Sequence, residues 1–265
     1  MRHVARVRVL ILRTAGTNCD LETQHAWELA GAQAERVHIR RLIEQPQAFA
    51  DYQILTLPGG FSYGDDIAAG RILANQVQRH LIDPLWRFMD ARKLILGICN
   101  GFQVLVQAGL LPTRRAVQDG PRTCTVTYNE PSGFQDRWVY LRAQSDRCVF
   151  LDAGQTYEMP IAHGEGRVTF STAADLESVV ANGQSALLYA GPRNGDVNLH
   201  GEPRNPNGSA GDIAGLCNET GHVLGLMPHP ERFVTWTQHP CWTSQPQRPQ
   251  GDGLALFQNA VAYFR

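Results

Sequence analysis

Long apolar runs are absent from this chain of 265 residues. No stretch approaches the ~20 apolar residues that a membrane-spanning helix requires. The short apolar run at 7–12 has charge at its edges and is too short for a secretory signal. A basic excess is absent as well, because the formal net charge is −1, so no positive field indicates a nucleic-acid partner. These absences favour a cytoplasmic protein that binds neither membrane nor nucleic acid.

Cysteine is scarce and scattered in this sequence. The six cysteines form no C-x-x-C pair and no spacing typical of a zinc site. The sequence therefore indicates neither a disulfide framework nor a structural metal, and the simplest interpretation is a reduced protein with one specialised cysteine. The other five are interpreted as ordinary thiols, namely Cys19, Cys124, Cys148, Cys217 and Cys241.

The specialised cysteine lies in a motif that has a mechanism. Residues 97–101 read G-I-C-N-G, between an apolar run at 94–96 that is typical of a buried strand and a helical pattern at 101–108. This arrangement predicts a tight strand-to-helix turn with Cys99 at its tip, because side chains at the two glycines would collide. The helix N-terminus then favours the thiolate. A buried structural cysteine in a glycine-rich turn is the alternative.

A second motif supplies a candidate base. Residues 226–232 read L-M-P-H-P-E-R, which places His229 and Glu231 two apart between prolines that forbid a helix. In an extended segment, residues two apart point the same way, so both side chains can share one face. Together with Cys99 they provide a nucleophile, a base and a group that orients the base. A surface-loop histidine beside a solvated glutamate is the alternative.

Strand-like and helical stretches alternate in the first half. Strands are expected at 7–12, 37–39, 53–57 and 94–98, and helices at 21–30, 67–91 and 101–108. We expect Asp20 to cap the first helix, Asp65 or Asp66 to cap the second, and a break in the second before Pro84. The alternation predicts the α/β class, with a mostly parallel central sheet and helices on both faces. Catalytic residues then belong at the carboxyl ends of the strands.

The second half contains shorter strands and longer loops. Strands are expected at 123–128, 138–143, 167–170, 186–189 and 223–227, and a last helix at 254–264. The segments 192–212 and 235–253 are rich in Pro with Gly, Asn, Gln or Trp and are expected to be loops. No stretch resembles a domain linker, so residues 1–265 are predicted to form a single domain.

Four further blocks carry a resemblance to a known family. They are 13–20 (R-T-A-G-T-N-C-D), 57–66 (L-P-G-G-F-S-Y-G-D-D), 160–167 (P-I-A-H-G-E-G-R) and 225–232 (G-L-M-P-H-P-E-R). With the Cys99 motif, they make the chain similar to the class I, or triad-type, glutamine amidotransferases, which have a flavodoxin-like fold. Among these it resembles the glutaminase subunits of phosphoribosylformylglycinamidine synthases, from purine biosynthesis. The second and third blocks indicate this narrower group.

The resemblance implies a reaction and a triad. Cys99, His229 and Glu231 would hydrolyse the side-chain amide of glutamine through a glutamyl thioester and release ammonia. Asn100 follows the nucleophile at the helix start and offers one backbone N–H to the oxyanion. The resemblance assigns the second donor to Gly60, which also falls at the carboxyl end of a strand.

Three more residues are candidate substrate contacts. Gln103 lies one helical turn after the nucleophile, and in the superfamily this position contacts glutamine. His163 and Glu165 would line the glutamine pocket or the adjacent partner surface by resemblance. A solvated helix glutamine and a polar glycine-rich turn are the respective alternatives.

The resemblance also implies partners. A large synthetase subunit would take the ammonia and convert formylglycinamide ribonucleotide to formylglycinamidine ribonucleotide, and some bacterial complexes add a small bridging subunit. This chain has no P-loop, so ATP and magnesium are expected on the partner, and the subunit is expected to need no cofactor and no metal. The loops at 61–63 and 235–253 are candidate docking surfaces.

Two other interpretations stay open. A stand-alone hydrolase of the same superfamily, such as a γ-glutamyl hydrolase, would share Cys99 and His229, although Glu231 and the G-G-F-S-Y-G-D block disfavour it. A silent amidotransferase-like binding module is disfavoured by the complete triad. The chain also departs from compact family members by extra length at 192–212 and 235–253.

Overall fold

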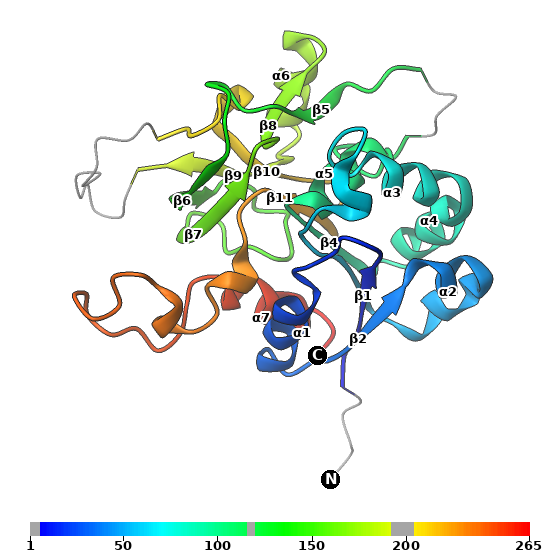
Figure 1. Ribbon diagram of the computed structural model, residues 1–265, viewed down its shortest axis with the longest axis horizontal. Coiled ribbons are helices and arrows are strands. Elements are labelled where there is room, and N and C mark those ends of the chain that lie inside the picture. The colour runs from blue at the N-terminus through cyan, green and yellow to red at the C-terminus, as the bar shows by residue number, and fades with distance from the viewer. Residues whose placement is uncertain (1–5, 116–119, 192–203) are drawn as a thin grey trace.

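The molecule is built on a mixed β-sheet, seen in a computed structural model that describes residues 6–115, 120–191 and 204–265 (Figure 1). The described strands are β1 (Arg8–Arg13), β2 (Gln33–His38), β3 (Ile54–Leu57), β4 (Leu94–Ile98), β5 (Cys124–Thr127), β6 (Gln135–Ala143), β7 (Thr156–His163), β8 (Arg167–Phe170), β9 (Ser185–Ala190), β10 (Ile213–Cys217) and β11 (Val223–Leu226). The described helices are α1 (Asp20–Leu29), α2 (Ile39–Glu44), α3 (Arg71–Gln76), α4 (Ile82–Asp90), α5 (Asn100–Gln107), α6 (Ala173–Ala181) and α7 (Leu254–Ala262).

The order of the strands positions the carboxyl ends of β3, β4 and β11 together. Nine described strands pair in the order β2-β1-β3-β4-β11-β10-β9-β6-β7, while β5 and β8 form a separate pair. The first five in that order are parallel, and the pairings from β11 to β7 are antiparallel. The parallel part has the flavodoxin-like order. The predicted α/β fold class is confirmed, with an antiparallel extension at one edge.

Helices cover both faces of the parallel strands. In Figure 1, α1 and α7 lie together on one side of these strands, and α2 to α5 lie on the other. The rings of Trp27 and Phe257 join α1 to α7 edge to face, with centroids 4.8 Å apart. In the described part of the chain, no helix combines the length and the apolar character that crossing a membrane would need.

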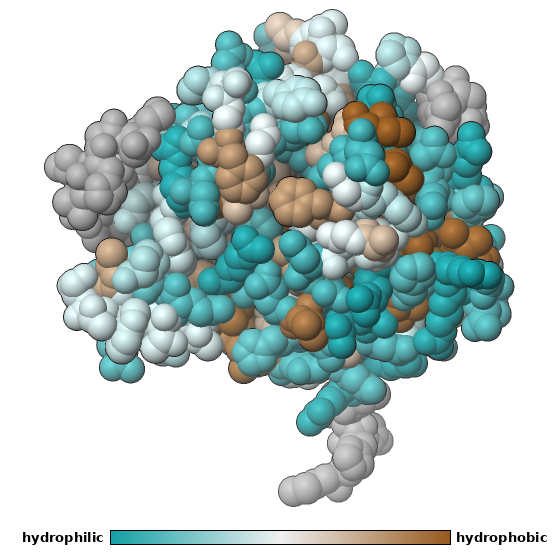
Figure 2. Space-filling model, viewed as in Figure 1, coloured by the Kyte–Doolittle hydropathy of each residue, from teal (hydrophilic) through white to brown (hydrophobic). Residues whose placement is uncertain are grey.

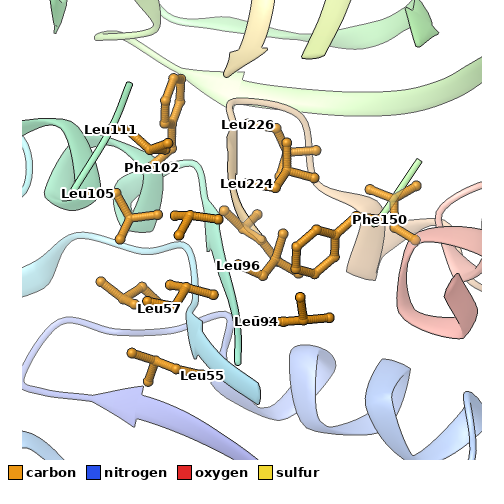
Figure 3. Packing of buried hydrophobic residues seen from close by; sticks show 14 of the residues in the cluster. Leu55, Leu57, Leu94, Leu96, Phe102, Leu105, Leu111, Phe150, Leu224 and Leu226 are labelled. Carbon is orange, nitrogen blue, oxygen red and sulfur yellow. The ribbon is translucent and has the colours of Figure 1, made fainter. Parts of the chain in front are cut away.

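The central strands are apolar because both of their faces are covered. Every residue of β4 and of β11 is buried. Figure 3 shows Leu94, Leu96, Leu224 and Leu226 packed between helical and loop side chains that include Phe102. Fully burying one such side chain contributes roughly 1.5–3 kcal/mol. This core holds the strand ends that carry the site in fixed positions.

Several predicted elements agree with the structure within a few residues. The expected strands at 53–57, 94–98, 167–170 and 223–227 appear as β3, β4, β8 and β11, and the last helix appears as α7. The predicted break before Pro84 is also present. A π-helical turn at Val77–Leu81 separates α3 from α4, and Pro84 sits in the first turn of α4, where its missing N–H costs nothing. The predicted loop at 192–212 lies partly outside the described residues.

Four helices and strands of the described chain were missed, namely α2, α6, β7 and β10. β7 contains Pro160, which disfavours a strand, but β7 is the last strand in the sheet order and an edge strand tolerates proline. β10 is short and its pairing with β9 is irregular. α6 had a readable signal: Thr172 and Asp175 form a reciprocal capping box at its start.

The predicted helix caps were wrong. Cys19, not Asp20, is the N-cap of α1, and the Asp20 carboxylate instead lies 3.4 Å from Arg13 Nε and 3.5 Å from Arg36 Nη1. The second helix begins at Arg71 rather than at 67, so neither Asp65 nor Asp66 is its N-cap. Asp65 Oδ1 instead accepts the N–H of the actual N-cap residue, Gly70, at 3.0 Å. These carboxylates tie separate segments together.

Candidate active site

Cys99 sits on a strained turn between β4 and α5. Its φ and ψ are 50° and −106°, outside the regions that L-residues prefer. A Cβ at Gly101 would stand 1.9 Å from Leu57 O, and one at Gly97 would stand 2.5 Å from Leu105 Cδ1. The predicted turn and the need for its two glycines are therefore confirmed. Cys99 N donates to Leu226 O at 2.8 Å, which ties the turn to β11.

His229 and Glu231 form a buried pair just beyond β11. His229 Nδ1 lies 2.6 Å from Glu231 Oε1, and their side chains are 2% and 0% exposed. The segment Pro230–Arg232 is a single 3-10 turn rather than the extended segment expected from sequence, yet it still turns both side chains to one side. His229 N donates to Pro160 O at 2.9 Å, so β7 also holds the pair.

The sheet register brings Cys99 to His229. In the parallel pairing of β4 with β11, Ile98 stands opposite Leu226, so the chain leaves both strands at the same edge. Burial opposes a charged imidazole, but the charges of Glu231 and Cys99 outweigh it and hold the pKa of His229 well above its usual value. His229 Nε2 is buried and has no hydrogen-bond partner among the described residues. The raised pKa favours the imidazolium, which carries a proton on this nitrogen.

Gly60 lies at the end of β3 in a conformation reserved for glycine. Its φ is 135°, and a Cβ there would come within 2.8 Å of Asn18 N and of Gly16 O. Thr17 and Gly60 form an isolated β-bridge, which holds this loop against the 13–20 block. Close approach of backbone to a ligand is a use that such a glycine permits.

The side chain of Asn100 connects the nucleophile turn to the loop after Gly60. Its Oδ1 accepts from Ser62 N at 3.3 Å, and its Nδ2 donates to Asp65 Oδ1 and to Gln103 Oε1, both at 3.1 Å. Burial raises the pKa of Asp65, although the hydrogen bonds from Gly70 and Asn100 oppose that shift. Asn100 therefore joins α5 to the turn at Ser62–Asp65 with one amide.

These groups surround a pocket of about 590 Å³, a usual size for a small-molecule site. Its wall includes six of the eight candidate residues, Gly60, Cys99, Gln103, His163, Glu165 and His229, whereas Asn100 and Glu231 are not part of it. The amide of Gln103 is engaged, since Gln103 Nε2 donates to Glu165 O at 2.5 Å. On the face drawn in Figure 2, small patches of apolar residues lie between hydrophilic residues. The exposed apolar residues of the pocket wall are Phe61, Tyr128 and Phe134.

His163 ends β7 and Glu165 follows it, and both residues line the pocket wall. His163 Nδ1 lies 3.1 Å from Asn129 Oδ1, while His163 Nε2 is buried with no hydrogen-bond partner in the described chain. Burial lowers the pKa of His163 to about 4. Burial and then the nearby charge of Asp65 raise the pKa of Glu165. Contact of either residue with glutamine stays a prediction.

We expect His163 to destabilise the protein in acid. Its folded pKa of about 4 lies below the ordinary 6.5, so the unfolded chain takes up a proton that the folded chain refuses. Stability should therefore fall as the pH drops from about 6.5 to about 4, by about 3 kcal/mol from this residue alone. Urea unfolding of the wild type and of His163→Gln across this pH range measures how the free energy of unfolding changes with pH in each protein. Parallel stability curves for the two proteins would contradict the assignment.

Cys19 is the site residue that sequence reasoning missed. The interpretation as an ordinary thiol did not anticipate its position, because Cys19 lines the same pocket as Cys99 and its sulfur accepts from Arg232 Nη2 at 3.2 Å. Its membership in the 13–20 block was the available signal. Of the other cysteines, Cys124, Cys148 and Cys217 are buried free thiols, and Cys241 is exposed.

Comparisons with known proteins agree with this geometry. Residues 6–264 match the family described as the CobB/CobQ-like glutamine amidotransferase domain. The subunit PurQ of phosphoribosylformylglycinamidine synthase from Dehalococcoides mccartyi is 44% identical over 263 residues, with 99% of each chain covered. PurQ from Methanococcus maripaludis is 39% identical over 273 residues, with 97% of each chain covered.

A solved structure gives the same result in three dimensions. The chain is similar to a chain in the structure of PurLQS from Thermotoga maritima, with a TM-score of 0.72, 29% sequence identity, and coverage of 98% of this chain and 100% of that one. Sequence and fold thus agree over almost the whole length. The chain belongs to the CobB/CobQ-like glutamine amidotransferase family and, within it, to the family of PurQ subunits of phosphoribosylformylglycinamidine synthase.

Proposed function

We propose that this protein is the glutaminase subunit of a phosphoribosylformylglycinamidine synthase. It hydrolyses glutamine and supplies ammonia for the conversion of formylglycinamide ribonucleotide to formylglycinamidine ribonucleotide in purine biosynthesis. The observation that carries the chemistry is the buried pair of His229 and Glu231, 2.6 Å apart, at the strand edge where Cys99 stands on its turn. Family membership supports the biological role.

The first half of the reaction forms a thioester. The sulfur of Cys99 attacks the amide carbon of the glutamine side chain, and His229 Nε2 takes the thiol proton. Glu231 keeps the imidazole oriented through Nδ1 and stabilises its charged form. The proton then passes from His229 to the leaving nitrogen. The carbon–nitrogen bond breaks, ammonia departs, and glutamate remains bound through its side-chain carbonyl to the sulfur.

The second half of the reaction restores the enzyme. A water molecule attacks the thioester carbon while His229 removes its proton, and the proton returns to the sulfur of Cys99 as glutamate leaves. Both tetrahedral states carry a negative oxygen. The backbone N–H groups of Gly60 and Asn100 are the proposed donors to it, and losing one such donor typically costs about 2.7–4 kcal/mol.

The ammonia requires a partner protein. We propose a large synthetase subunit together with a small bridging subunit, as the name PurLQS of the similar Thermotoga maritima structure suggests. ATP and magnesium belong on the synthetase, and this subunit works without a cofactor or metal. The exposed Phe61, Tyr128 and Phe134 at the pocket wall, with the 235–253 loop, are the proposed docking surface. Residues 1–265 act as one amidotransferase domain.

Glutamate release from glutamine tests the proposal. The wild-type subunit is assayed alone and with its synthetase, formylglycinamide ribonucleotide and ATP. Slow release alone and a sharp rise in the complex is the expected result. A full rate without any partner would instead identify a stand-alone hydrolase. No release under any condition, while the partner still uses added ammonia, would identify a binding module.

The Asn100 side chain should matter independently of its backbone N–H. Asn100→Asp places a second carboxylate beside Asp65 and removes the donor to Gln103, so kcat should fall about 10- to 100-fold, equivalent to about 1.4–2.7 kcal/mol. Adding Asp65→Asn restores one donor–acceptor pair between positions 65 and 100, so kcat should rise about tenfold from its value in Asn100→Asp. Independent sites do not show such a coupling. Strictly additive losses in the double variant would reject the proposed link.

A further inference from the structure

A second thiol stands beside the catalytic histidine, and the proposed reaction does not use it. Cys19 is 1% exposed and occupies the N-cap of α1. Its sulfur accepts a hydrogen bond from Arg232 Nη2 and donates one to Asn18 Oδ1, both at 3.2 Å. Burial raises the pKa of this thiol, while His229 and Arg232 act in the opposite direction. Cys19 is thus buried, has polar neighbours and lies close to the reacting groups.

Cys19 belongs to a compact set of possible metal ligands. The sulfur of Cys19, one ring nitrogen of His229 and one carboxylate oxygen of Glu231 all lie within 4.8 Å of one another, and all three residues are buried. No other such group of three occurs in the described chain. Glu231 Oε2 is also without a hydrogen-bond partner among the described residues, although its side chain is 0% exposed. A buried carboxylate oxygen without a partner is costly unless something binds it.

We propose that Cys19, His229 and Glu231 form an inhibitory site for a zinc ion. Cysteine sulfur, imidazole nitrogen and carboxylate oxygen are each ligands that zinc binds in proteins. Bond lengths of about 2.0–2.3 Å place tetrahedral ligands roughly 3.3–3.8 Å apart, so ligand atoms that now lie within 4.8 Å of one another have to close by at most about 1 Å. Three protein ligands leave the fourth position open to water from the pocket.

Charge and proton balance favour the same ion. Binding requires Cys19 and the charged imidazole of His229 each to lose a proton to solvent, after which one thiolate and one carboxylate balance the two positive charges of zinc. Arg232 keeps its hydrogen bond to the sulfur as an outer partner of the site. Magnesium and calcium prefer sets made only of oxygen and are poor candidates for a site with a thiolate.

The consequence of binding is loss of the general base. A zinc ion bound to His229 and Glu231 breaks their 2.6 Å contact and stops His229 from taking the Cys99 proton. Inhibition therefore rests on the proposed function, whereas zinc binding itself does not. Free zinc would switch off ammonia release without altering the fold, and a chelator would restore it.

Zinc binding to Cys99→Ala distinguishes this site from the obvious rival, a zinc ion held by Cys99 and His229. Equilibrium dialysis of the full chain with zinc, and cobalt absorption as a direct sign of thiolate ligation, need no activity. We expect one zinc ion per Cys99→Ala chain and at least a tenfold weaker Kd when Cys19→Ser is added. Cys241→Ser, which removes the exposed cysteine, is the matched control and should leave the Kd unchanged.

Either of two results would overturn the proposal. Loss of zinc binding in Cys99→Ala, with binding kept in Cys19→Ser, would assign the ion to Cys99. Equal affinity in Cys99→Ala with and without Cys19→Ser would place it elsewhere. In the active wild type, zinc should inhibit glutamate release. When each protein's rate is expressed relative to its own uninhibited rate, the half-inhibiting zinc concentration should be at least tenfold higher in Cys19→Ser than in the wild type.

Discussion

Replacing Cys99 by alanine should abolish ammonia production from glutamine while the protein stays folded. The alanine side chain fits the turn, because it only removes the sulfur from a residue that is already buried at 7% exposure. Without a nucleophile, no thioester forms, and a loss of at least about 10⁴-fold in kcat is typical for such a residue. The assay is glutamate release by the complex, with ammonia-dependent synthesis as the internal measure of an intact partner.

The control for this change is Cys124→Ala, which removes a buried thiol outside the wall of the active-site pocket and should keep the wild-type rate. Ammonia-dependent synthesis should remain unchanged with Cys99→Ala, because the synthetase then receives its nitrogen from solution. A Cys99→Ala subunit that keeps about a tenth of the glutaminase rate would show that another group attacks the amide.

Glu231→Gln should cost about 10³- to 10⁴-fold in kcat with little change in the fold. The amide keeps the size of the side chain but loses the charge that helps to raise the pKa of His229. It also no longer offers a charged acceptor to His229 Nδ1. Burial then dominates and lowers the pKa of His229, so the imidazolium is lost at neutral pH. We expect slower alkylation of Cys99 by iodoacetamide between about pH 6 and pH 8.

Glu22→Gln serves as the comparison for the charge change. Glu22 pairs with Arg232 at 3.0 Å near the same site, but its side chain is 38% exposed and it does not contact the imidazole in the structure. Its replacement should leave both the alkylation rate and kcat close to wild type. Equal effects from Glu22→Gln and Glu231→Gln would mean that general field effects, not orientation of His229, explain the loss.

The parallel half of the fold was predictable because its signals are local. Apolar runs at 53–57 and 94–98 sit in strands covered on both faces, and the turn at Cys99 requires the glycines on either side of it. The antiparallel extension was harder to predict. β7 carries a proline and β10 pairs irregularly, so their strand character depends on neighbours that sequence periodicity does not reveal.

The predictions of the helix caps were wrong for a related reason. An acidic residue before an apolar helical pattern is a reasonable N-cap, yet Asp20 and Asp65 are used for longer-range contacts with Arg13, Arg36 and Asn100. Such contacts depend on which segments the sheet order brings together. The same holds for Asn100, whose backbone role was predicted but whose side-chain contacts were not.

The sequence by itself determined the chemical parts of the site. It identified Cys99 on its turn and His229 with Glu231, because glycine permits tight turns and proline restricts the backbone wherever they occur. Only the tertiary structure decided that these parts meet. The parallel register of β4 with β11 aligns the two strand ends, and the bridge between Thr17 and Gly60 carries the 13–20 block, with Cys19, to the same edge. That proximity arises from pairing between segments far apart in the chain, which no local pattern encodes.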